Sequence, residues 1–183
     1  PEATDVLVCS TGVIGVSLDM PLLLDGAAAA VDALTAEERG AHEAATAIMT
    51  TDTVSKEDAL TLSTADGATW HLGGMIKGVG MLAPGLATML CVLTTDAVVD
   101  PTGAQAALAR ATARTVNRIS SDGCMSTNDT VLMLASGASG AVPSQAELDA
   151  AVTQVLGLLS RRLVADAEGA THDIAITVSG AVS

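Results

Sequence analysis

The chain of 183 residues is long enough for one domain with a buried core, and 49% of its residues are hydrophobic. It has no Phe or Tyr and one Trp, so we expect a core of Leu, Val, Ile, Met and Ala whose stability depends on close packing or on an oligomer interface. Because 21 acidic residues outnumber 8 basic ones, the net charge of −13 argues against binding to nucleic acid or to an anionic membrane surface.

The first half of the chain predicts a strand, two helices and a hairpin, in that order. Residues 5–10 contain an apolar run that is typical of a buried strand, and a Thr-Gly turn follows it. Pro21 can begin a helix that ends near Leu34. The capping-box pattern at residues 35–38 predicts a second helix, to about residue 48. Residues 61–72 are expected to form a hairpin around an Asp-Gly turn.

The second half predicts strands alternating with helices. Residues 88–94, 131–135 and 174–178 are apolar enough for strands, the last of them closing the sheet. Asp100 caps a helix that is expected to end near residue 118, and a second capping box begins a helix over residues 144–163. Since strands and helices alternate irregularly around a hairpin, we expect an α/β protein, an α+β layered sandwich with mixed sheets, rather than a Rossmann sheet.

The cysteines and histidines show no metal-binding or disulfide pattern. Cys9 and Cys91 lie within apolar runs, so we expect buried thiols in a reducing compartment. The three histidines are isolated from one another, which predicts ordinary polar side chains rather than a zinc site. Without a signal peptide or an apolar run of about 18 residues, the sequence predicts a soluble, cytoplasmic protein with no membrane partner.

One glycine-rich run, residues 74–90 (GMIKGVGMLAPGLATML), combines a single lysine, Lys77, with a single hydroxyl, that of Thr88. Threonine is a weak nucleophile unless a base lies beside it. At a new N-terminus, however, its own α-amine, with a pKa of roughly 7.7–8.0 in model peptides, can accept the proton. The run therefore suggests that the chain cleaves itself between Ala87 and Thr88 and then uses Thr88 for acyl transfer. The alternative is a threonine that merely begins a strand.

Four further segments along the chain are informative together with this run. They are residues 9–15 (CSTGVIG), 47–52 (AIMTTD), 126–130 (STNDT) and 165–169 (ADAEG). Together the five segments resemble the ornithine acetyltransferase family, the bifunctional glutamate N-acetyltransferases of arginine biosynthesis. The resemblance spans nearly the whole chain and implies the layered fold that this family shares with self-processing aminopeptidases. Residues 1–183 would then form a single domain, the central portion of the family fold without its upstream and long downstream segments.

The resemblance implies that Thr88 acts as a nucleophile twice. Its hydroxyl would attack the carbonyl of Ala87, an N-to-O acyl shift would form an ester, and water would release two chains. The freed amine would then act as the base while the hydroxyl accepts acetyl from N-acetylornithine and passes it to glutamate. Thr11 and Gly12 align with the family's oxyanion-hole pair, a role that could lower the barrier by about 3–4 kcal/mol. Otherwise they form an ordinary turn.

Thr50, Lys77 and Glu168 align with the family's substrate-binding residues. Lys77 would pair with the substrate carboxylate, and Glu168 with its amino group. Without the resemblance, Lys77 would be interpreted as an exposed lysine between turns and Glu168 as a solvated helix end. Asp52 is expected to cap the segment that follows it, and residues 126–130 to brace the site through hydrogen bonds.

The leading hypothesis is a ping-pong acetyltransferase that needs no metal and no bound cofactor, with acetyl-CoA as an alternative acetyl donor. The expected partners are small-molecule substrates, the second chain of an α/β heteromer after cleavage, and further copies in a homo-oligomer. Two alternatives stay open. The chain could be a non-catalytic fragment that needs the missing segments for transfer. It could also be an N-terminal-nucleophile aminopeptidase, although those relatives typically carry serine at the cleavage point.

Overall fold

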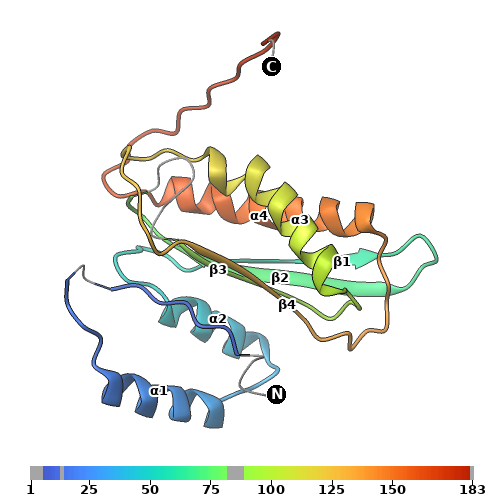
Figure 1. The fold of residues 1–183 in the computed structure, drawn as a ribbon, viewed down its shortest axis with the longest axis horizontal. Coiled ribbons are helices and arrows are strands. Elements are labelled where there is room, and N and C mark those ends of the chain that lie inside the picture. The colour runs from blue at the N-terminus through green and yellow to red at the C-terminus, as the bar shows by residue number, and fades with distance from the viewer. Residues whose placement is uncertain (1–5, 13–14, 82–88, 182–183) are drawn as a thin grey trace.

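The computed structural model describes residues 6–12, 15–81 and 89–181. Within these ranges the elements, in chain order, are α1 (Met20–Asp32), α2 (Glu38–Ala47), β1 (Lys56–Ser63), β2 (Thr69–Lys77), β3 (Leu90–Thr95), α3 (Pro101–Arg114), a short 3₁₀ turn η2 (Val116–Arg118), β4 (Thr130–Ala135) and α4 (Gln145–Ala165). The mixture of helices and strands in layers confirms the predicted fold class (Figure 1).

The strands form one mixed sheet in the order β1-β2-β3-β4. β1 pairs with β2 and β2 with β3 in antiparallel register, and the hairpin between β1 and β2 turns at Gly67, whose φ of 89° lies in the left-handed region that favours glycine. β4 pairs with β3 in parallel, with α3 lying between the two in the chain. The predicted hairpin and the predicted strands in the middle of the chain are therefore confirmed.

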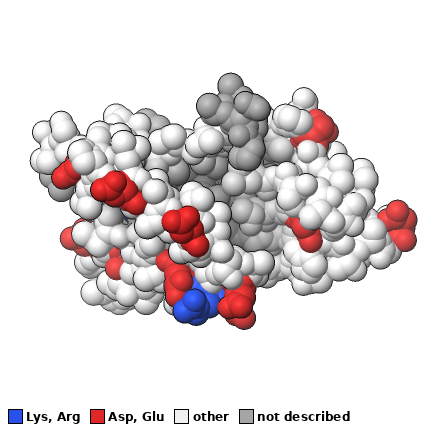
Figure 2. Space-filling view, turned by 90° about the horizontal axis from the view of Figure 1, so that it is seen from below, with Lys and Arg blue, Asp and Glu red and all other residues white. Residues whose placement is uncertain are grey.

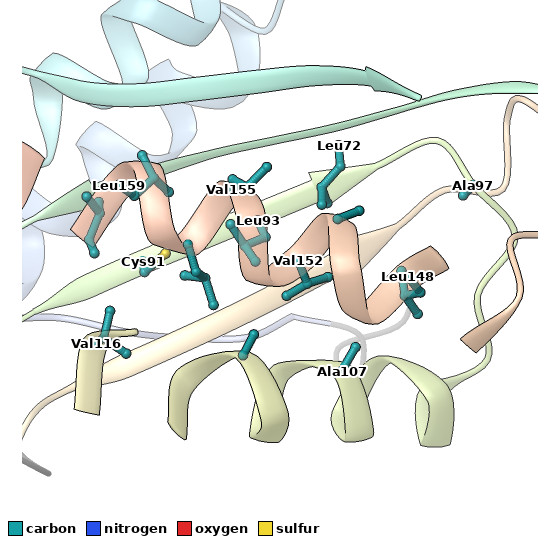
Figure 3. Packing of buried hydrophobic residues seen from close by; sticks show 14 of the residues in the cluster. Leu72, Cys91, Leu93, Ala97, Ala107, Val116, Leu148, Val152, Val155 and Leu159 are labelled. Atoms are coloured by element: carbon teal, nitrogen blue, oxygen red, sulfur yellow. The ribbon is translucent and has the colours of Figure 1, made fainter. Parts of the chain in front are cut away.

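The core lies between one face of the sheet and the two long helices, α3 and α4 (Figures 1 and 3). Leu72 and Leu93 on the sheet face Val152 and Val155 of α4, and all four side chains are fully buried. The only aromatic residue, Trp70, is also in this cluster. As the composition predicts, Leu, Val, Ile and Ala fill most of the core, and alanines on α3 let that helix pack closely.

The local signals for helix ends are largely confirmed. The side chain of Asp100 accepts hydrogen bonds from the backbone N–H groups of the first turn of α3. Ser144 and Glu147 form the complete capping box of α4. At residues 35–38, by contrast, no capping box forms, and α2 begins only at Glu38 without a side-chain cap.

The other face of the sheet is covered only in part. α2 lies beside β1 and β2 and leaves a cavity of about 660 Å³ against them, while α1 buries none of its residues. Figure 2, seen from the side on which α1 lies, shows acidic side chains dispersed over a mostly uncharged surface. In the described part of the chain, no helix combines the length and the hydropathy needed to cross a bilayer.

Two of the predicted strands are wrong. Residues 6–10 form no strand. Val8 is 85% exposed, and Cys9 is only half-buried although Cys91 is buried as expected. Residues 174–178 form no strand either, and Ile176 is 86% exposed (Figure 1). An apolar run becomes a strand only where a neighbouring strand satisfies its N–H and C=O groups, and neither run has such a neighbour among the described residues. The predicted strand at residues 131–135 forms, but it is half-buried rather than buried.

Candidate active site

The sheet topology brings five chain segments to one edge. Because Lys56 pairs with Ile76, and Leu90 with both Lys77 and Thr130, the start of β1, the end of β2 and the starts of β3 and β4 lie at the same edge. The segments before β1, after β2, before β3 and before β4 therefore converge there. The C-terminal end of α4 joins them through an ion pair between Asp166 and Lys56.

Lys77 ends β2 at this edge with its side chain pointing to Thr50. Its Nζ donates a hydrogen bond of 3.0 Å to Thr50 Oγ1, and the residue is only 3% exposed. Burial lowers the pKa of Lys77, and the nearby charge of Lys56 adds to this effect, while Asp52 and Asp129 oppose it without cancelling it. The interpretation of Lys77 as an exposed lysine is therefore wrong, and the two residues that the resemblance pairs as substrate ligands are in contact.

Glu168 follows α4 and reaches the same strand exit. Its backbone N–H donates a 2.7 Å hydrogen bond to the carbonyl of Val79, two residues after Lys77. Its Oε2 lies 3.6 Å from the position that a Cβ on Gly80 would occupy. Glu168 is thus bound to the segment that contains Lys77, 91 residues away in sequence, and its side chain is solvent-exposed.

Thr11 and Gly12 line a cavity of about 480 Å³ next to this cluster. Its other walls include Met81 and residues 125–128. Met81 is the next residue after Gly80, so the chain leaving β2 passes from the Lys77 cluster directly to this cavity. Its φ of 55° is rare for a residue with a side chain and is the type of local strain that clusters at functional sites.

The predicted nucleophile and cleavage point, Ala87 and Thr88, lie outside the described residues. Met81 and Met89, the described residues on either side of residues 82–88, are both bonded to the loop that precedes β4. The backbone N–H of Met81 donates to Asp122 Oδ2 at 2.6 Å, and that of Met89 donates to Asp129 Oδ1 at 2.8 Å. The bond from Met89 to Asp129 supports the interpretation of residues 126–130 as a brace, and Asp122 lies just before that range.

Sequence analysis missed the group at the centre of this edge, the ammonium of Lys56. Its Nζ donates to Asp52 Oδ1 at 2.7 Å and to Asp166 Oδ2 at 2.5 Å, and its side chain has no exposed surface. The prediction that Asp52 caps the next segment is wrong, because its carboxylate instead accepts from Lys56, from the N–H of Gly78 and from the N–H of Thr50. A signal was available: the chain has two lysines, and Lys56 stands four residues after Asp52.

Both carboxyls that flank Lys56 are held in the ionised form. Burial alone would raise the pKa of Asp52, but hydrogen bonds from Lys56, Gly78 and Thr50 outweigh it and bring the pKa below its ordinary value. Burial opposes the same shift at Asp166, where hydrogen bonds from Lys56 and Thr53 lower the pKa. The cluster therefore contains two carboxylates at neutral pH.

The described hydrogen bonds of the three histidine side chains are made to residues outside this cluster, and the buried thiol of Cys91 belongs to the core. His42 contacts Glu57, His71 contacts Asp96 and His172 contacts Thr171, all at exposed positions. Across residues 6–12, 15–81 and 89–181, no three His, Cys, Asp or Glu side chains gather in a way that could hold a metal ion. Burial raises the pKa of the Cys91 thiol to about 12, which leaves it unreactive in the core.

Comparison with known proteins gives one consistent result. The chain matches the ArgJ family over residues 1–183. It is 54% identical over 182 residues to the arginine biosynthesis bifunctional protein ArgJ of Bifidobacterium longum, covering 100% of this chain and 46% of that protein. The ArgJ proteins of Mycobacterium leprae (55% over 181 residues, 99% of this chain, 44% of that protein) and Thermobifida fusca (54% over 182 residues, 100% and 46%) are similar to it as well. The chain thus spans about half the length of these relatives.

Proposed function

Because the chain belongs to the ArgJ family, as its five sequence segments predict, we propose that it acts in acetyl transfer from N-acetylornithine to glutamate. In this proposal the chain first cleaves itself between Ala87 and Thr88, and Thr88 then carries the acetyl group. Family membership also favours the transferase over the aminopeptidase alternative.

One observation supports the proposal more than any other: Lys77 is hydrogen-bonded to Thr50, with Glu168 at the same strand exit. The three residues come from separate parts of the chain, and nothing in their sequence spacing requires them to meet. In an otherwise acidic protein, the buried ammonium of Lys77 offers the local positive charge that a substrate carboxylate needs. The exposed side chain of Glu168, whose backbone N–H is bonded to the carbonyl of Val79, would bind a substrate amino group.

Self-cleavage is the first proposed step. The Thr88 hydroxyl attacks the carbonyl carbon of Ala87, the C–N bond breaks as the acyl group moves to oxygen, and water hydrolyses the resulting ester. The hydrogen bonds from Met81 to Asp122 and from Met89 to Asp129 support this step, since they hold the described residues on both sides of the cleavage point.

Acetyl transfer is the second step. The free α-amine of Thr88 takes the hydroxyl proton while the oxygen attacks the acetyl carbonyl, and ornithine leaves as the amine. Glutamate then attacks the acetyl-threonine ester and leaves with the acetyl group. The Thr11 hydroxyl and the Gly12 N–H would stabilise the oxyanion in each half-reaction by about 3–4 kcal/mol, and their position in the wall of the adjoining cavity supports that role.

The two products of cleavage are expected to stay together as an α/β heteromer. The cut falls between β2 and β3, which pair along Leu72–Lys77 and Leu90–Thr95 of one sheet, and α4 packs on β1 and β2 across the cut. We also propose further association into a homo-oligomer, a cytoplasmic location, no bound cofactor, and acetyl-CoA as a second acetyl donor.

The test is intact mass under denaturing conditions, with Thr88→Ala as the inactive variant and Thr88→Ser as the conservative control. We expect two fragments divided at Ala87–Thr88 in the wild type and in Thr88→Ser, and a single mass in Thr88→Ala. A single uncut mass in the wild type would contradict the proposed nucleophile.

Transfer is measured separately, because the chain spans about half of its relatives. The assay follows acetyl from N-acetylornithine to glutamate, with parallel double-reciprocal lines expected for a ping-pong route. Cleavage without transfer would support the alternative of a module that needs further segments for its pocket.

A further inference from the structure

Both lysines of the chain are buried, and only Lys77 is accounted for by the proposed substrate contacts. Lys56 is 1% exposed, and its three N–H donors face three acceptors: Asp52 Oδ1 at 2.7 Å, Asp166 Oδ2 at 2.5 Å and the carbonyl of Val54 at 3.4 Å. Lysine is rarely buried to this extent without a partner. A buried ammonium at the edge of the sheet that carries the candidate site therefore needs a functional explanation.

The first partner of Lys56 connects it to two proposed substrate-binding segments. Asp52 Oδ1, besides accepting from Lys56, accepts from the backbone N–H of Gly78 at 2.7 Å. Its Oδ2 accepts from the N–H of Thr50 at 3.2 Å. One carboxylate thus holds the backbone of Gly78 and that of Thr50, which favours the contact between the side chains of Lys77 and Thr50.

The second partner connects Lys56 to the third segment. Asp166 is the C-cap residue of α4 and also binds the N–H and the hydroxyl of Thr53. Two residues later, the N–H of Glu168 binds Val79. The Lys56–Asp166 ion pair therefore fixes the end of α4 relative to the sheet. It thereby also fixes the position of Glu168 beside the exit of β2.

Burial of this cluster is not explained by stability alone. In the other pairs of basic and acidic side chains that the structure describes, the basic side chain is 47–75% exposed: Arg39, His42, His71, Arg110 and Arg162. Removing charges from water has a desolvation cost that can exceed the attraction between them, so a buried pair is weak support for a stabilising role and is better justified by specificity of arrangement.

We propose that Lys56 is the positioning residue of this site: held between Asp52 and Asp166, its ammonium fixes Thr50, Lys77 and Glu168 in the mutual arrangement that binds substrate. Lys56 does not reach substrate itself but acts through its two carboxylate partners. What the three residues bind rests on the proposed function, whereas their fixing by Lys56 rests on the contacts alone.

The test uses the double variant Lys56→Met/Asp166→Asn of the whole chain. It removes one positive and one negative charge, keeps similar side-chain shapes, and leaves the Asp52 carboxylate in place but without the ammonium that fixes it. The matched control is Arg110→Met/Asp149→Asn, which removes the ion pair between α3 and α4 away from the site edge. Both variants are measured by amide hydrogen exchange and, where the wild type transfers acetyl, by steady-state kinetics.

Exchange at the amides of Gly78 and Glu168 is expected to accelerate at least about tenfold in the site variant and to stay unchanged in the control, with the core amide of Leu93 unchanged in both. The KM for N-acetylornithine is expected to rise about tenfold or more, with kcat within about threefold of the wild type. Loss of the Lys56 charge should also move the Lys77 side-chain titration, followed by NMR, to higher pH in the site variant only.

Unchanged exchange at Gly78 and Glu168 would overturn the positioning role, whether or not the protein transfers acetyl. Absence of transfer in the wild type, with acceleration at those two amides alone, would overturn the proposed function and leave the positioning role standing. If the double variant does not fold, Asp166→Asn alone retains the Lys56–Asp52 pair and should accelerate Glu168 more than Gly78. Equal acceleration of the two amides over their wild-type exchange rates in that variant would then overturn the inference.

Discussion

Two regions of this protein are both rich in apolar residues but differ in how far those residues are buried. The sheet layer, made of β1–β4 with α3 and α4, buries most of its large apolar side chains in one core. The N-terminal arm, residues 6–12 and 15–47 with α1 and α2, leaves most of its apolar side chains in solvent, among them Leu22 at 71% and Val8 at 85% exposure. In the whole arm, Ala45 is the one residue of the described part that is fully buried.

The comparison shows that local sequence can form a helix without deciding whether that helix is packed. α1 has an N-cap from Asp19 and a proline in its first turn, so its ends are specified locally. What it lacks is a facing surface. The same division runs through the candidate site, where Lys77 and Glu168 belong to the firmly packed layer, while Thr11 and Gly12 belong to the arm.

The largest expected difference between the two regions is the cost of truncating a leucine. Leu159→Ala, in the fully buried centre of α4, should lower the free energy of unfolding by about 2–5 kcal/mol because it leaves a cavity in the core. Leu22→Ala, on the exposed face of α1, should change it by no more than about 0.5 kcal/mol. Urea denaturation of both variants measures this, and a large cost for Leu22→Ala would show that α1 is covered in solution.

A smaller difference is expected between the two predicted capping boxes. Ser144→Ala removes the cap of α4, whose Ser144 and Glu147 bond reciprocally, and should cost about 0.5–2 kcal/mol. Thr35→Ala, at the start of the arm's second helix, removes no helix cap and should cost less. Thermal unfolding followed by circular dichroism compares the two. Equal losses would mean that Thr35 contributes to folding in a way that its one bond to the N–H of Glu37 does not explain.

The smallest expected effect at neutral pH, but the most specific one, is the loss of folding stability in acid. A carboxyl with a lowered pKa in the folded state stabilises that state above its unfolded pKa of about 3.9, and this stabilisation is lost as the pH falls through the folded value. Asp52 and Asp166 are such groups, because their pKa values are lowered in the folded state, so wild-type stability should fall as the pH drops below about 4. Asp166→Asn should flatten that fall, whereas Asp25→Asn on the exposed α1 should not. Urea titrations at several pH values measure the slopes, and identical slopes in all three proteins would contradict the assignment.

Some of the site was accessible from sequence and some was not. The resemblance identified Thr50, Lys77 and Glu168 by their motifs. The structure places Thr50 in contact with Lys77 and bonds the backbone of Glu168 to Val79, two residues after Lys77. The resemblance did not identify Lys56. The spacing of Asp52 and Lys56 suggests one partner, but a lysine at the start of a strand is ordinarily solvated, and nothing local indicates the second partner, Asp166, 110 positions later. The two failed strands have a related cause, since an apolar run specifies burial only if a partner is present.

The sequence by itself determined the elements whose causes are local. These are the hairpin at Gly67, the cap at Asp100, the capping box at Ser144, and the alanine-rich and leucine-rich faces that became α3 and α4. Only the tertiary structure decided which apolar runs were covered and which charges were buried. The physical reason is the sequence separation of the interacting residues. Capping and turn geometry depend on a few neighbouring residues, whereas burial and ion pairing at Lys56 depend on distant segments that meet only in the folded sheet.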